Sequence, residues 1–113
     1  MRKSSAAKTW QVAAPVFAAL GDEHRIALVR RLSTDGPASI SRLTEGAGIT
    51  RQGISKHLRV LEEAGLVRNT RRGRESIWSL EPERVAAAQR ALDEISRQWD
   101  DAIGRLRAFV EED

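Results

Sequence analysis

The chain has 113 residues, of which 41% are hydrophobic and 31% charged, with a formal net charge of +3 and no cysteine. This is the usual size of one domain, so we expect a single domain over residues 1–113. The missing cysteines exclude disulfides, thiolate metal sites and thiol nucleophiles. No apolar run approaches the roughly 20 residues of a membrane span, and no apolar block follows the basic N-terminus. We therefore expect a cytoplasmic protein with no membrane partner.

In chain order, the first predicted elements are two helices within residues 9–33. Apolar residues between Thr9 and Leu20 predict the first helix, in which Pro15 either causes a kink or starts a new helix. Asp22 is a good N-cap for the second helix, and the segment 33–37 is typical of a helix end.

Residues 39–64 show the spacing of two short helices joined by a tight turn. The first is predicted over 39–45, and glycines at 46 and 48 suit the turn. Thr50 is an N-cap for a helix over 50–64, and Gly65 suits the position after its end. This order is the helix-turn-helix pattern.

The region 66–80 predicts a β-hairpin, with strands over 66–70 and 75–80 and a tip over 71–74. A final helix is predicted over 82–112, with Pro82 in its first turn. The fold class is therefore mainly α, with about five helices and one small β-hairpin.

Charge is distributed unevenly along these elements. Residues 50–80 carry seven Lys or Arg and three Asp or Glu, whereas residues 81–113 carry five and nine. Single arginines usually only solubilise a helix face, but this clustering predicts a local surface for a polyanion, with the acidic segment facing elsewhere.

The helix over 50–64 separates a polar face from an apolar face. The guanidinium groups of Arg51 and Arg59 match guanine O6 and N7, and the amide of Gln52 matches adenine N6 and N7. The ammonium group of Lys56 suits a phosphate. A polar face alone is usually only solvated, but this one follows a tight turn and precedes a basic hairpin. We therefore expect DNA contacts from Thr50, Arg51, Gln52, Ser55, Lys56 and Arg59.

The hairpin tip carries three arginines around Gly73. Charges on an edge strand also protect a sheet from aggregation, but three at one tip exceed that need. We expect Arg71, Arg72 and Arg74 to reach a phosphate or the minor groove.

Apolar residues of the last helix recur with alternating spacings of three and four, from Val85 to Phe109. A helix over 82–112 would be about 46 Å long, too long to bury this stripe against so small a domain. We expect a second copy of the chain to bury this stripe. The alternative is that the helix packs against the core of its own chain. The expected dimer contacts are Trp10, Val12, Phe17, Leu92, Ile95, Trp99, Ile103 and Leu106.

Two motifs carry a family resemblance over residues 14–80. One is Ser55-x-His57-Leu58 followed by Leu61-x-x-Ala64-Gly65-Leu66-Val67, and the other is Ala19-Leu20-Gly21-Asp22-x-x-Arg25. They resemble the recognition-helix signature and the start of the second helix in ArsR (ArsR/SmtB-type) repressors. The resemblance implies a winged helix-turn-helix fold dimerising through its first and last helices, operator DNA as partner, and release by a small-molecule or protein effector.

The chain departs from the metal-sensing members of that family. They carry a cysteine-containing motif on the third helix, where this chain has residues 40–44 without cysteine, or histidines on the last helix, which has none here. His57 falls on the apolar face, so we expect it to be partly buried and hydrogen-bonded, with a phosphate contact as the alternative. His24 is expected at the surface or as a cap. We therefore expect no metal, no cofactor and no metal sensing.

The leading hypothesis is a dimeric, sequence-specific transcriptional regulator that represses. A winged-helix module that binds protein without DNA is the second hypothesis. An enzyme is the third and weakest, because no cluster supplies a nucleophile, a base or a phosphate cradle.

Overall fold

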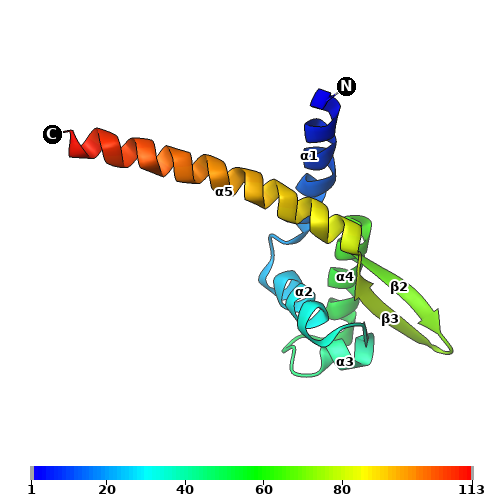
Figure 1. The fold of residues 1–113 in the computed structure, drawn as a ribbon. Coiled ribbons are helices and arrows are strands. Elements are labelled where there is room, and N and C mark those ends of the chain that lie inside the picture. The colour runs from blue at the N-terminus through cyan, green and yellow to red at the C-terminus, as the bar shows by residue number, and fades with distance from the viewer. Residues whose placement is uncertain (1, 113) are drawn as a thin grey trace.

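The computed structural model describes residues 2–112, with side chains from Thr9 onward. Across this range it has five helices and a three-stranded antiparallel sheet, which confirms a mainly helical winged helix-turn-helix fold (Figure 1). In chain order the elements are α1 (Arg2–Ala19), α2 (Glu23–Asp35), β1 (Ala38–Ser39), α3 (Ile40–Thr44), α4 (Arg51–Glu63), β2 (Val67–Arg72), β3 (Glu75–Leu80) and α5 (Pro82–Glu111).

Helix α1 starts earlier than predicted, at Arg2 rather than Thr9. The added residues include alanine and lysine, which are good helix formers. Pro15 lies inside the helix, so the helix does not start again there. Pro15 is exposed, and its missing N–H leaves the Gln11 carbonyl without a helical donor at a position open to water.

Helix α2 begins as predicted and ends later. The Asp22 carboxylate accepts hydrogen bonds from the backbone N–H groups of His24 and Arg25, which satisfies the first turn. The helix continues to Asp35, beyond the predicted 33, because the Gly36 N–H donates to the Leu32 carbonyl and closes the last turn.

The sheet has one strand more than the predicted hairpin. Strand β1 pairs with β3, with Ala38 opposite Trp78, and gives the strand order β1-β3-β2. The predicted tip over 71–74 was too wide, because Arg71 and Arg72 belong to β2 and Arg72 pairs with Glu75. The turn is tight because Gly73 adopts a φ of +63°, which glycine tolerates.

The core is built on the inner face of α4. Ile54, Leu58 and Leu61 are all fully buried, and they recur at the spacing of one helix face. They pack with buried residues from α2, α3 and the sheet, among them Leu28, Leu43 and Trp78. This packing fixes which face of α4 points outward. None of the described helices is long and apolar enough to cross a membrane.

Candidate nucleic-acid interface

The outer face of α4 presents most of the residues predicted to contact DNA. Thr50 caps the helix, since its hydroxyl oxygen accepts a hydrogen bond from the Gly53 N–H at 3.0 Å. Four of the other predicted contacts are exposed and one is half-buried. The exposed residues are Arg51, Gln52, Lys56 and Arg59, and the half-buried one is Ser55.

A cleft of about 250 Å³ separates this face from the wing, the hairpin formed by β2 and β3. Arg51 and Ser55 of α4 line it together with Arg74 of the wing turn, so the fold brings these three predicted residues together. Ser41 of α3 also lines it and accepts a hydrogen bond from Arg51 Nη1 at 3.3 Å. Ser41 was not predicted, because a lone serine on a five-residue helix carries no pattern.

The wing places its arginines at different positions. Arg71 and Arg72 are exposed on β2, while Arg74 is exposed in the turn. Arg72 also lines a second cleft, of about 260 Å³, with Arg42 of α3. The described cations therefore extend from the outer face of α4 around the wing, a distribution that attracts a polyanion.

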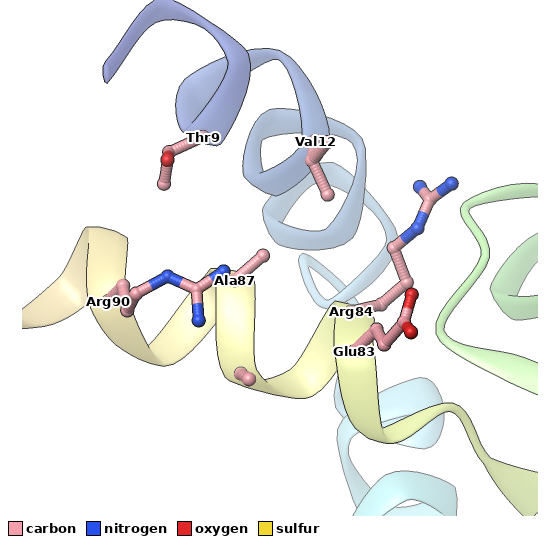
Figure 2. Close-up of a pocket in the computed structure, with 7 residues that line it drawn as sticks. Thr9, Val12, Glu83, Arg84, Ala87 and Arg90 are labelled. Carbon is pink, nitrogen blue, oxygen red and sulfur yellow. The ribbon is translucent and has the colours of Figure 1, made fainter. Parts of the chain in front are cut away.

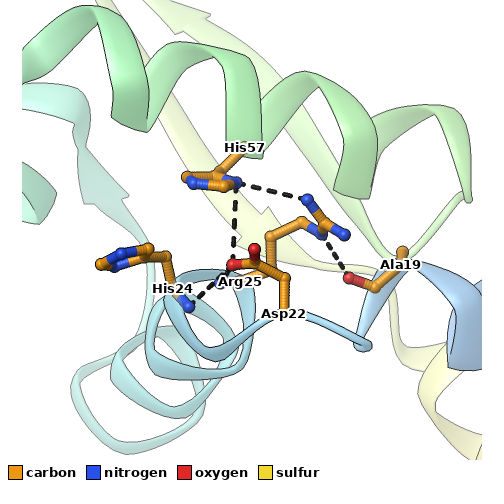
Figure 3. A network of polar contacts seen from close by, with 5 residues as sticks. All are labelled: Ala19, Asp22, His24, Arg25 and His57. Carbon is orange, nitrogen blue, oxygen red and sulfur yellow. Dashed lines mark hydrogen bonds and ion pairs between the residues drawn. The ribbon is translucent and has the colours of Figure 1, made fainter. Parts of the chain in front are cut away.

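A polar network joins α4 to the start of α2 (Figure 3). His57 Nδ1 lies 3.4 Å from Arg25 Nη1 and 4.0 Å from Asp22 Oδ1, and the His57 side chain is 20% exposed. This matches the expected partly buried, hydrogen-bonded role of His57. His24 does not cap the helix, but lies half-buried with its ring 5.5 Å from that of His57.

The same network affects the ionisation of Asp22. Hydrogen bonds from the backbone N–H of Arg25 and then of His24 hold the pKa of the Asp22 carboxyl below its ordinary value, against opposition from desolvation. The charges of His57 and Arg25 lower it further. The network thus favours a charged Asp22 at the junction of α2 and α4.

Arg31 of α2 fixes the end of α3 and the following turn. Its guanidinium donates to the carbonyl oxygens of Arg42, Leu43 and Glu45 at 2.9–3.0 Å. The Arg42 carbonyl also accepts from the Glu45 N–H, whereas Arg31 supplies the donor for the Leu43 and Glu45 carbonyls at the end of this short helix. This role of Arg31 was not predicted, because it depends on the tertiary approach of α2 to α3.

The predicted dimer contacts divide into two groups. On α5, Leu92, Trp99, Ile103 and Leu106 are exposed, while Ile95 is half-buried. On α1, Trp10, Val12 and Phe17 are half-buried within their own chain, and Trp10 Nε1 donates to Glu94 Oε2 of α5 at 3.2 Å. Figure 1 shows the far half of α5 projecting away from the rest of the chain.

Comparison with known proteins gives consistent matches. Residues 20–70 match a family described as a helix-turn-helix domain. The HTH-type transcriptional regulator Rv2034 of Mycobacterium tuberculosis is 35% identical over 85 residues, which cover 75% of this chain and 76% of that protein.

Two solved structures extend the similarity to most of the fold. An ArsR-like transcriptional regulator from Rhodococcus sp. RHA1 has 31% identity and a TM-score of 0.70, covering 90% of this chain and 95% of that one. The transcriptional repressor BigR from Xylella fastidiosa has 29% identity and a TM-score of 0.62, covering 84% and 96%.

The fold and the exposed polar face of α4 beside the wing define the winged helix-turn-helix DNA-binding domain of a transcriptional regulator. Within that class, the chain belongs to the ArsR family.

Proposed function

We propose that this protein is a homodimeric, sequence-specific DNA-binding repressor. The observation that carries the proposal is the arrangement of α4, whose inner face is buried in the core while its polar face lies open beside a cationic wing. A helix of this kind inserts its N-terminal residues into the major groove.

The residues fall into two roles. Arg51, Gln52 and Arg59 have the donor geometry that distinguishes base edges, and Ser55 is small enough to allow close approach. Thr50 and Lys56 suit phosphates at the mouth of the groove. The wing arginines, namely Arg71, Arg72 and Arg74, suit the neighbouring backbone or minor groove.

Dimerisation through α5 is the second part of the proposal. Trp99 is 63% exposed and Leu106 is 62% exposed, and such a stripe on one helix is a costly surface to leave in water. Pairing the two α5 helices would cover it, with α1 beside them. A two-fold axis would then set the two α4 helices about 34 Å apart, in successive major grooves.

The repressor role is supported by the similarity to BigR, which is described as a transcriptional repressor. Metal-independent regulation is supported by composition, since the chain has no cysteine and only two histidines. A winged-helix module that binds only protein is disfavoured by the excess of arginine on α4 and the wing. No catalytic activity is proposed.

Footprinting of the purified protein on DNA upstream of its own gene tests the proposal. We expect two protected segments on one face of the duplex, about 10 base pairs apart between centres. Protection of one segment alone would contradict the dimeric arrangement, and no protection at low salt across several DNA fragments would contradict DNA binding.

A further inference from the structure

The cleft between α4 and the wing lies away from the seam of the proposed dimer. A larger groove, of about 470 Å³, is lined by Val12 of α1 and Ala87 of α5 (Figure 2), and the partner subunit of the proposed dimer would cover it. The lining of the cleft beside α4 comes instead from α3, α4 and the β-strands. Its side chains therefore remain open on the face proposed for DNA.

At this cleft, α3 and α4 are joined by a hydrogen bond between two side chains. Arg51 Nη1 donates to Ser41 Oγ at 3.3 Å, although both residues are exposed. In the part of the chain that the structure describes, no ion pair involves Arg51, and its guanidinium has no other hydrogen-bond partner. The orientation of this guanidinium in the free protein therefore depends on Ser41.

Both residues are attached to well-anchored parts of the fold. Arg51 is the first residue of α4, whose inner face is buried in the core. Ser41 lies on α3, whose N-cap Ser39 accepts a hydrogen bond from a backbone N–H of the first turn at 3.2 Å, and whose Leu43 is buried. The hydroxyl group of Ser41 is therefore held beside the start of α4.

A guanidinium held in this way still has the donors that guanine requires. It carries five N–H groups, and the bond to Ser41 uses one of those on Nη1. The edge formed by Nε and Nη2 remains free, and this edge can donate two parallel hydrogen bonds to guanine O6 and N7. A long side chain that is already oriented also loses less rotamer freedom when it binds.

We propose that Ser41 is a positioning residue that sets the base preference of Arg51. The Ser41 hydroxyl orients the guanidinium before DNA binds, so that its free edge meets guanine with both donors in place. The other bases do not offer the same pair of acceptors, so they gain less from this orientation. The effect on base preference rests on the proposed function, whereas the ordering of Arg51 in the free protein does not.

Fluorescence anisotropy with the preferred duplex and its single-base variants tests the effect on DNA. At the position where Arg51→Ala relaxes the preference, we expect Ser41→Ala to reduce the preference about 5-fold, as suits the ordering of one long side chain. Ser41→Thr keeps the hydroxyl and should retain the preference. In an Arg51→Ala background, Ser41→Ala should have no further effect.

A matched control separates this role from a general effect of losing a hydroxyl. Ser33→Ala removes an exposed hydroxyl of α2 outside the cleft, and it should bind every duplex as the wild type does. If Ser41→Ala weakened binding equally on all duplexes, or acted equally with and without the Arg51 side chain, Ser41 would contact DNA itself and the proposal would be overturned.

Nitrogen-15 relaxation of the Arg51 Nε–Hε group in the free protein tests the positioning without DNA. We expect a higher order parameter in the wild type and Ser41→Thr than in Ser41→Ala, with no change at Arg59, an exposed arginine of the same helix. Equal order parameters for Arg51 in the wild type and Ser41→Ala would overturn the proposal. Ordering of Arg51 by Ser41 in a protein that binds no duplex DNA would instead contradict the proposed function.

Discussion

The imidazole of His57 lies with Nδ1 4.0 Å from Oδ1 of Asp22, so a side chain of the recognition helix faces the N-cap of α2. The Arg25 guanidinium lies 3.4 Å from the same nitrogen. The N-cap carboxylate of α2 and the imidazole of α4 therefore belong to one polar network.

The lowered pKa of Asp22 predicts a pH-dependent contribution to stability. Because the folded-state pKa is below the ordinary value of 3.8, this contribution is present above about pH 4 and is lost as the pH falls through the lowered pKa. Asp22→Asn keeps a good capping side chain but removes the charge. We expect its free energy of unfolding, measured by urea titration, to fall less steeply than that of the wild type below pH 4.

A variant at another acidic position separates this effect from the general loss of charge. Asp93→Asn removes the same charge at an exposed position of α5, outside the network. If the free energy of unfolding changed with pH in the same way in Asp22→Asn and the wild type, the network would not stabilise the charged carboxylate.

The Arg31→Ala variant should bind DNA more weakly although it removes no charged contact to DNA. Arg31→Ala removes the side-chain donor from the part-buried Leu43 carbonyl and the exposed Glu45 carbonyl, at a cost of about 1 kcal/mol in stability. We expect weaker DNA binding with an unchanged dependence on salt, because no phosphate contact is removed. Arg30→Ala, exposed on the same helix, is the control, and an equal loss of stability there would contradict the role of Arg31.

The two proposed kinds of DNA contact predict different mutant behaviour. Arg51→Ala or Gln52→Ala should relax the preference at one base step and cost about 1–3 kcal/mol on the preferred sequence. Arg72→Ala should weaken binding to all sequences alike and reduce the salt slope by about one. Anisotropy on a set of single-base variants distinguishes them, and identical profiles for both kinds of variant would refute the assignment.

Dimerisation is tested by placing a charge on the exposed stripe of α5. Leu92 is 51% exposed in its own chain, so Leu92→Glu should leave the fold of each subunit intact. We expect a monomer in sedimentation velocity, unchanged circular dichroism and much weaker DNA binding. Gln89→Glu, at an exposed polar position one turn earlier, should remain dimeric. A Leu92→Glu monomer with wild-type DNA affinity would be incompatible with the dimeric mechanism.

The fold follows from the sequence wherever local signals are strong. The caps Asp22 and Thr50 and the turn glycine Gly65 mark helix ends by local chemistry, and the structure confirms all three positions. The inner face of α4 follows from its apolar spacing at Ile54, Leu58 and Leu61, whereas Val60, also on the predicted apolar face, is exposed.

Features that depend on distant residues were not predicted. Strand β1 is two residues long and exists because Ala38 and Ser39 pair with β3, far along the chain. The roles of Arg31 and Ser41 likewise arise from tertiary approach. Trp10 was predicted only as a dimer contact, yet it bonds Glu94 of its own chain, a partner 84 residues away.

The dissociation constant for duplex DNA, measured at a series of salt concentrations, tests the central claim most directly. If cationic side chains replace counterions on several phosphates, binding should weaken steeply as salt is added. The logarithm of the affinity should then fall by about 0.9 per unit of log salt concentration for each phosphate neutralised. A slope corresponding to several phosphates supports the interface formed by α4 and the wing. Binding that is absent at low salt, or that does not change with salt, would contradict it.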